Sequence, residues 1–280
     1  MKRKISAGLL IKFIIYLKYL PSVILQIRNW PVFLLNYINI GFVKPGTYKF
    51  RNGISIKTVD AHGAGAIAVI FMKKDYGVVD DNSTIIDIGA NIGVYSLFAA
   101  SAKNTVVYAF EPDPSNFELL VKNVRLNKLE KRIIPFNLAV GSEKGKRTLY
   151  LGEAPFHSFC PVSESPFNAL YPSHSGGAKQ NSIEVACVSL KDIFDKNKIS
   201  HCDILKIDCE GAEYEILYNL PEKYFQRIKK IHLEYHNHKK NAMNTGDCLL
   251  KFLEKKGLQL KRHKKGSAYQ GDLWLERQPL

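Results

Sequence analysis

The residues best suited to binding chemistry lie in the segment IIDIGANIGVYS, at positions 85–96. This segment places Asp87, Gly89, Asn91 and Gly93 in the pattern Asp-x-Gly-x-Asn-x-Gly. The two glycines allow the backbone to turn tightly and to approach a ligand closely. A helix expected to start at the second glycine presents free N–H groups and a partial positive charge, which attract a carboxylate or a phosphate. The acid would repel a diphosphate, so the loop favours a ligand that also carries a cation.

One further acid is placed to bind a ribose. Glu111 ends the next expected strand, 24 residues after Asp87, and a carboxylate at such a place accepts two hydrogen bonds from a ribose diol. This arrangement serves NAD and S-adenosylmethionine alike. The loop lacks the third glycine of the dinucleotide pattern G-x-G-x-x-G, so the spacing favours S-adenosylmethionine over NAD. A glycine turn that binds no ligand is the simpler alternative.

Three residues near expected strand ends could accept a proton from an acceptor hydroxyl. Asp208 and Glu210 follow one strand, and His236 follows the next. In an open parallel sheet, ligands bind outside the carboxyl ends of the strands. Carboxylate and imidazole side chains at such a place could accept a proton from a bound substrate. They also suit Mg²⁺ or Mn²⁺ by ligand type, although a metal is not the favoured interpretation.

Two of the polar residues in this region have plainer interpretations. His236 lies in the polar run HNHKK and could equally be a surface residue. Glu213 lies one helical turn after Glu210, and we interpret it as a carboxylate stabilised by the dipole at a helix N-terminus.

Three segments resemble the FkbM-type S-adenosylmethionine-dependent methyltransferases, namely IIDIGANIGVYS, FEPDPSNFELLVKNVRLN and LKIDCEGAEYEIL. The resemblance covers residues 83–234, and its most specific part is the block at 206–213. It implies that the methionine part of the cofactor is surrounded by Asp87, Gly89, Asn91 and Gly93, that Glu111 holds the ribose, and that Asn137 lies beside the adenine. It also implies methyl transfer to oxygen, on a hydroxyl of a sugar, a glycan or a secondary metabolite.

Alternating strand and helix patterns predict an α/β fold with a doubly wound, mostly parallel, Rossmann-like sheet of the class I methyltransferase type. The strands are expected at 84–88, 105–110, 132–140, 183–188, 203–207 and 229–234. Residues 258–263 and 272–276 are expected to form a C-terminal antiparallel hairpin that covers one edge of the sheet. A short lead-in hairpin is expected over 48–50 and 54–58.

The expected organisation is a basic amphipathic helical segment at 1–42, a methyltransferase domain at 43–280, a motif core at 83–234 and a lid-like insert at 152–182. The insert shows no helical or strand period and is rich in proline and glycine. A loop of this length in a compact domain is usually functional, so we interpret it as a lid over the substrate. His157, Ser158 and Tyr171 could reach the substrate from it, although a solvated loop is the simpler interpretation for each.

Composition and charge limit the partners. The chain has 280 residues, 46% hydrophobic and 24% charged, which excludes a disordered or collagen-like chain. Its net charge is +14, and residues 1–59 carry ten Lys/Arg and no acid. A nucleic-acid-directed methyltransferase or binder is therefore the alternative function. The sequence contains no zinc finger and no RNP-like motif, so a nucleic-acid partner is not the favoured interpretation.

Residues 1–20 predict a helix with a basic face and a broad apolar face, too often interrupted by charge to span a membrane. Such a helix could lie on an anionic membrane or pack on the domain itself. The five cysteines include no Cys-x-x-Cys pair, which favours a reducing compartment. We therefore expect a cytoplasmic protein, with peripheral attachment to the inner face of the membrane as the second location.

Overall fold

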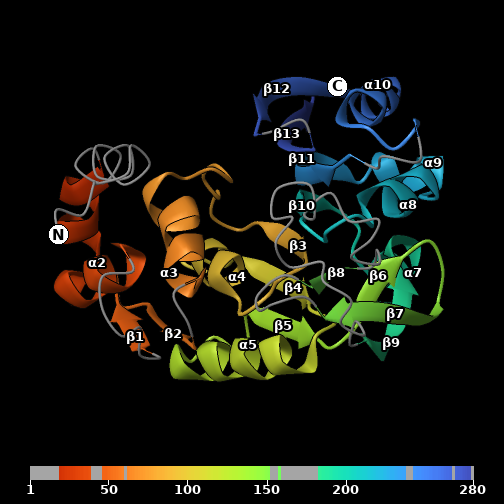
Figure 1. The fold of residues 1–280 in the computed structure, drawn as a ribbon. Helices are drawn as coiled ribbons and strands as arrows, with labels where there is room; N and C mark the ends of the chain where they lie inside the picture. Colours follow the sequence, from red (N-terminus) through yellow and green to blue (C-terminus); the bar gives the residue numbers. More distant parts are fainter. Residues whose placement is uncertain are drawn as a thin grey trace, which may run out of the picture.

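The computed structural model describes residues 19–38, 46–59, 62–151, 157–158, 182–237, 242–266 and 269–278. Its centre is a seven-stranded sheet in the order β12-β13-β11-β10-β3-β4-β5 (Figure 1). The strands are β3 (Thr84–Ile88), β4 (Val106–Phe110), β5 (Ile133–Phe136), β10 (Cys202–Ile207), β11 (Ile228–His236), β12 (Leu258–Lys265) and β13 (Gln270–Arg277). All neighbouring pairs from β5 to β11 are parallel. The predicted α/β fold with a mostly parallel sheet is therefore confirmed.

The C-terminal hairpin is confirmed, but its two strands enter the sheet in an order that the sequence did not predict. β13 pairs antiparallel with both β11 and β12, so β12 forms the edge and runs parallel to β11. Burial explains this order, because Leu273 and Leu275 of β13 are buried whereas β12 is mostly exposed. A lysine-rich strand such as β12 is suited to an edge, where its charges discourage pairing with another chain.

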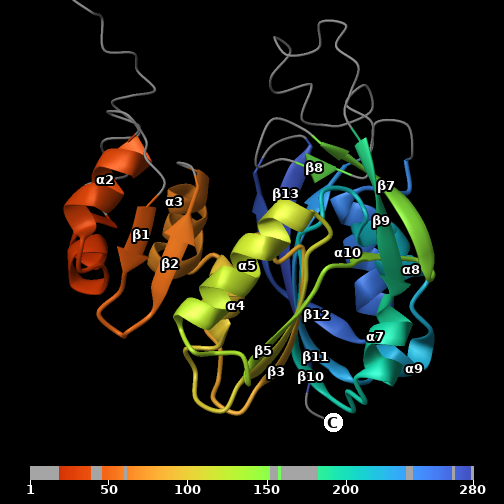
Figure 2. The same cartoon turned by 90° about the horizontal axis from the view of Figure 1, so that it is seen from below.

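Helices cover both faces of the sheet, as the doubly wound pattern predicts (Figure 2). One face carries α4 (Val94–Ala99) and α5 (Pro114–Leu126), and the other carries α7 (Leu190–Lys196), α8 (Glu213–Tyr218), α9 (Glu222–Phe225) and α10 (Gly246–Lys255). Successive side chains of β3 point to opposite faces. Ile85 accordingly joins the core beneath α4 and α5, whereas Ile86 joins the core beneath α8 and α10.

The segment 132–140 is not one strand, as predicted, but two strands in different sheets. β5 ends at Phe136, and β6 begins a second sheet of order β6-β9-β7-β8. Its strands are β6 (Ala139–Gly141), β7 (Gly145–Leu151), β8 (His157–Ser158) and β9 (Ser182–Ser189). Between the two sheets, the side-chain amide of Asn137 donates to the backbone oxygens of Glu111 and Pro112, at 2.9 and 3.0 Å. These bonds hold the chain at the point where it leaves β4.

The predicted lid lies mostly outside the described residues. Of that insert, the structure describes His157 and Ser158, which pair with β7, and Ser182, the first residue of β9. Tyr171 also lies outside the described residues.

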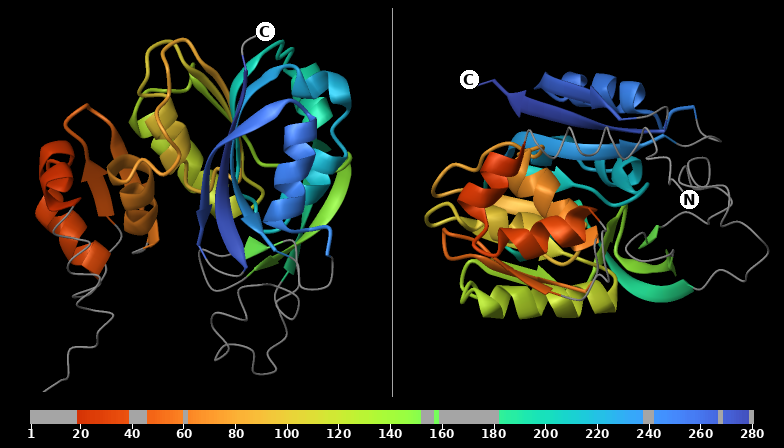
Figure 3. Two further views of the ribbon diagram at one scale, coloured as in Figure 1. Left: turned by 90° about the horizontal axis from the view of Figure 1, so that it is seen from above. Right: turned by 60° about the vertical axis from the view of Figure 1, so that its left-hand side comes forward.

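An N-terminal unit precedes the sheet and packs beside α4 and α5 (Figure 3). Residues 19–26 are helical. They are followed by α2 (Trp30–Ile38), the antiparallel pair β1 (Gly46–Lys49) and β2 (Ser55–Thr58), α3 (His62–Ile67) and the π-helix η1 (Ala68–Met72). The lead-in hairpin is thus confirmed. Residues 1–18, most of the predicted amphipathic helix, lie outside the described residues, and no described helix is long and apolar enough to cross a membrane.

Asn123 on α5 and Asn127, the residue that caps its C-terminus, bond to the open edge of β2. Asn127 exchanges two hydrogen bonds with the backbone of Ser55, both 2.7 Å. Asn123 does the same with Lys57, at 2.8 and 3.1 Å, and also donates to the oxygen of Ile92 at 2.9 Å. One buried side chain therefore ties the N-terminal hairpin to the loop before α4.

Asn123→Ala is expected to lower the free energy of unfolding by about 2–3 kcal/mol, because it leaves buried backbone groups without partners. Urea denaturation of the full chain measures this change. Glu118→Ala on the same helix is the matched control, since its side chain is 68% exposed, and it should change stability by less than about 0.5 kcal/mol. Equal effects of the two variants would contradict the role given to Asn123.

Candidate functional site

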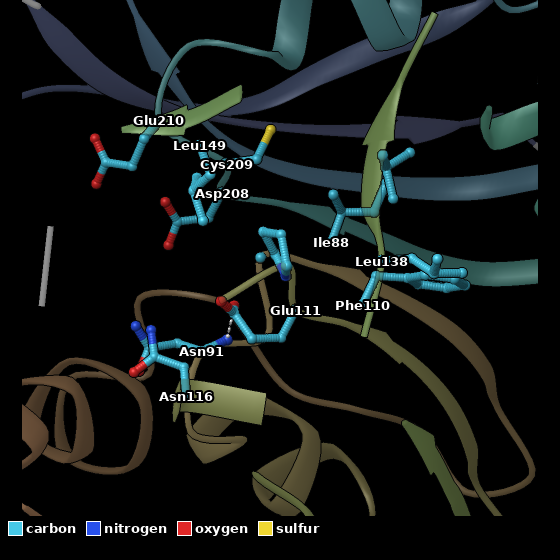
Figure 4. Close-up of a pocket in the computed structure, with 13 residues that line it drawn as sticks. Ile88, Asn91, Phe110, Glu111, Asn116, Leu138, Leu149, Asp208, Cys209 and Glu210 are labelled. Atoms are coloured by element: carbon cyan, nitrogen blue, oxygen red, sulfur yellow. Dashed lines mark hydrogen bonds between the residues drawn. The ribbon is translucent and has the colours of Figure 1, made fainter. Parts of the chain in front are cut away.

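A pocket opens at the carboxyl ends of β3, β4 and β10 (Figure 4). It is lined by Ile88, Gly89, Asn91, Phe110, Glu111, Pro112, Asn116, Leu138, Val140, Leu149, Asp208, Cys209 and Glu210. In Figure 4, Asp208 and Glu210 lie on one side of the pocket, with Glu111 and Asn91 across from them. The structure therefore brings together five of the nine predicted site residues. The other four, Asp87, Gly93, Asn137 and His236, are not among the lining residues.

The glycines of the loop serve different purposes. Gly89 has a φ of +74°, and a Cβ there would lie 1.7 Å from the backbone oxygen of Asp208. Only glycine therefore allows the loops after β3 and β10 to meet at the pocket. At Gly93, with a φ of +87°, packing disfavours a side chain, because a Cβ there would lie 2.4 Å from the Leu120 side chain on α5.

Glu111 presents a buried carboxylate to the pocket. Its two oxygens accept hydrogen bonds from the backbone N–H groups of Asn91 and Asp113, at 2.8 and 2.9 Å. Burial raises its pKa to about 7, although these backbone bonds act in the opposite direction. Each carboxylate oxygen has a second lone pair, so the fixed group can still accept bonds from a ligand.

The pocket also has an apolar wall that the sequence motifs do not reveal. Phe110 stacks on Phe136 at 4.8 Å between ring centroids, and Leu138 lies close by. Val140 and Leu149 reach the pocket from the second sheet. A wall of this kind suits a flat apolar ring such as an adenine. The predicted adenine neighbour Asn137 instead bonds to the loop after β4.

Asp87 is fully buried and paired within the protein. Its carboxylate accepts a 2.6 Å hydrogen bond from Ser96 and lies 3.2 Å from Nζ of Lys206. Lys206 also donates to the oxygen of Gly89 at 2.8 Å. Burial lowers the pKa of Lys206, but Asp87 and Asp208 outweigh this effect and the net shift is upward. Lys206 thus offsets the negative charge of Asp87, which was expected to repel an anion. Lys206 opens the sequence block at 206–213, but that block does not indicate its ion pair with Asp87.

Asp208 is held by a residue from the N-terminal unit. The hydroxyl of Tyr76 donates to Oδ2 of Asp208 at 3.0 Å. Tyr76 is buried, and Nζ of Lys206 lies 5.7 Å from its ring centroid. No sequence signal marks Tyr76, because its contact with Asp208 spans 132 positions of the chain.

His236 is buried between carboxylates rather than exposed at the surface. Its Nδ1 lies 2.9 Å from Oε1 of Glu213, and its Nε2 lies 3.3 Å from Oε2 of Glu210. Burial opposes its positive charge, but Glu210 and Glu213 outweigh burial and raise the pKa of His236 well above its usual value. Glu213 begins α8, as predicted, and it also fixes this ring.

The remaining acids of this edge also have shifted pKa values. Burial raises the pKa of Glu210 to about 7 and that of Glu234, near the end of β11, to about 8.

Within the described ranges, no group of three or more His, Cys, Asp or Glu residues is arranged to hold a metal ion.

Comparison with known proteins identifies the family through a family model. A family model described as "Methyltransferase FkbM domain" matches residues 87–260. Methyltransferase sdnD of Sordaria araneosa is 27% identical over 187 residues, 59% of this chain and 71% of that protein. The 31-O-demethyl-FK506 methyltransferase FkbM of Streptomyces tacrolimicus is 27% identical over 214 residues, which cover 68% of this chain and 82% of that protein. The hexuronic acid methyltransferase AglP of Haloferax volcanii is 24% identical over 157 residues, which cover 56% of this chain and 57% of that protein.

Proposed function

The chain belongs to the FkbM family of S-adenosylmethionine-dependent methyltransferases, and from this we propose that it methylates a hydroxyl oxygen of a small-molecule or sugar acceptor. The observation that carries the proposal is one pocket that combines the glycine loop, Glu111 and the acids Asp208 and Glu210. Two relatives, a 31-O-demethyl-FK506 methyltransferase and a hexuronic acid methyltransferase, support an acceptor of this kind.

The pocket fits the cofactor at three places. Gly89 leaves room that a side chain would fill. The Glu111 carboxylate is fixed where a ribose diol could donate to it, and Phe110 and Leu138 offer an apolar wall for the adenine. When bound, S-adenosylmethionine supplies an electrophilic methyl group on a sulfonium.

On the acceptor side, Asp208 and Glu210 are the carboxylates that can take the hydroxyl proton, because both line the pocket. We assign this step to Asp208, which Tyr76 orients through its hydrogen bond. His236 does not line the pocket and lies between Glu210 and Glu213, so we do not assign the base to it. It instead holds Glu210 in place at 3.3 Å as a positioning residue.

Cofactor binding should depend on pH through Glu111. The ionised carboxylate is the form that accepts bonds from the ribose, and its pKa is about 7 in the protein without cofactor. Below that pH the proton on Glu111 must leave before binding, so the affinity should fall about tenfold between pH 8 and pH 6. Glu111→Gln should flatten this dependence, and Glu111→Ala should weaken binding by about 1–3 kcal/mol.

Calorimetric titration with S-adenosylmethionine and with NAD tests these statements, and transfer of a labelled methyl group tests the acceptor class. We expect binding of S-adenosylmethionine alone, and transfer to sugar or polyketide hydroxyls rather than to RNA. Preference for NAD would refute the cofactor assignment. If the labelled methyl group were transferred to RNA and not to small molecules, the proposed acceptor would be refuted and a nucleic-acid substrate would be favoured.

A further inference from the structure

The outward face of the N-terminal helices exposes large apolar side chains. Leu25 is 72% exposed on helix 19–26, and Val32 and Leu35 are 47% and 56% exposed on α2. A single exposed apolar residue is ordinary, but a group of them on one part of a surface marks an interaction site. Of the eight large hydrophobic side chains exposed among the described residues, these three and Val59 lie before position 60.

Packing leaves this face without a partner inside the described residues. The opposite sides of the two helices pack on the domain, since Val23, Ile27 and Phe33 are buried in a core that they share with α4 and α5. The helices lie at the end of the molecule away from the second sheet (Figures 1 and 3). A rotation that buried Leu25 or Leu35 would expose residues of that core, so the apolar face is a fixed feature of the fold.

The charge around this face has one sign. Residues 19–38, 46–59 and 62–74 contain six Lys/Arg and no Asp or Glu. Arg28 lies in the turn between helix 19–26 and α2 and is exposed. Arg51 is also exposed, and its Nε donates to the backbone oxygen of Ile24, which places its guanidinium beside Leu25.

We propose that this surface, defined as Leu25, Arg28, Val32, Leu35 and Arg51, docks on an anionic lipid surface. Apolar side chains enter the boundary between headgroups and acyl chains, while the guanidinium groups contact lipid phosphates. Such an attachment needs no spanning helix. A second copy of the chain is a poorer occupant, because a two-fold contact would bring two acid-free basic surfaces together.

Vesicle co-sedimentation of the full chain tests the proposal, with vesicles of phosphatidylcholine alone or with about a third phosphatidylglycerol. The variant Leu25→Glu/Leu35→Glu puts two charges on exposed positions, so its fold should persist and circular dichroism checks this. Met243→Glu is the control, because Met243 is 64% exposed and shortly precedes α10. Figure 1 shows α10 at the other end of the molecule from α2.

We expect salt-sensitive binding to the anionic vesicles only, weakened about tenfold or more by the double variant and unchanged by the control. Binding by the double variant equal to that of the wild type would overturn the proposal, as would absence of binding by the wild type. Size-exclusion chromatography with light scattering adds another arm. A dimer that the double variant converts to a monomer, without vesicle binding, would assign the face to self-association instead. S-adenosylmethionine binding is measured separately, so either outcome leaves the methyltransferase assignment independent.

Discussion

Asp208→Asn is expected to slow methyl transfer about 100- to 10,000-fold, the usual contribution of a general base. The substitution keeps the size of the side chain and an oxygen for the Tyr76 hydroxyl, but it removes the group that accepts the proton. Binding of S-adenosylmethionine should stay within about threefold of the wild type, since the ribose contact belongs to Glu111. Single-turnover transfer of a labelled methyl group to the acceptor found by screening measures the rate.

Two companion variants separate chemistry from structure. Asp247→Asn removes a carboxylate from an exposed position on α10 and should leave the rate unchanged. Tyr76→Phe keeps the ring but loses the 3.0 Å hydrogen bond, and it should slow transfer about tenfold while cofactor affinity is kept. Transfer by Asp208→Asn at nearly the wild-type rate would move the base to Glu210, and Glu210→Gln would then be the informative change.

Lys206→Met is expected to lower the free energy of unfolding by about 3–5 kcal/mol, because it leaves a buried charge without its partner. The Asp87 side chain is 0% exposed and the Lys206 side chain is 5% exposed. Oδ1 of Asp87 has no hydrogen bond and depends on this ion pair. Urea or thermal denaturation of the full chain measures the loss.

The double variant Lys206→Met/Asp87→Asn makes this prediction specific. Removing both charges should restore part of the lost stability, since no uncompensated charge then stays buried. Lys196→Met, at an exposed position on α7, should change stability by less than about 0.5 kcal/mol. If the double variant is no more stable than Lys206→Met, then lost packing rather than charge explains the effect.

The parts of the fold predicted correctly are those encoded by short-range patterns. β3, β4 and β10 are mostly apolar runs bounded by turn residues, and the glycine loop between β3 and α4 is a local arrangement of a few residues. The position of Glu111 could be predicted because it is the first polar residue after an apolar strand, and the end of that strand fixes where the residue lies. The C-terminal hairpin was predicted for the same reason, whereas the order of its strands depends on which of them is apolar enough to lie inside the sheet.

The missed features depend on contacts between distant segments. The strand break at Asn137 arises from bonds to residues 111 and 112, and a strand pattern does not contain them. Leu149 reaches the pocket, and Tyr76 reaches Asp208, from outside the sequence motifs. His236 is the clearest example, because the same polar sequence suits the surface or the interior, and only the positions of Glu210 and Glu213 decide between them.

The second sheet gives the protein a route to new acceptors by evolution. The pocket acids Glu111, Asp208 and Glu210 follow strands of the parallel sheet, whereas the pocket residue from β7 is the apolar Leu149. β7 pairs with β8 and β9 in the second sheet, and it forms no pair with a strand of the parallel sheet among the described residues. Mutation or changes of length around β7 can therefore reshape one wall of the pocket without shifting the register that aligns Glu111 with Asp208. Divergent acceptors could arise on an unchanged methyl-transfer apparatus.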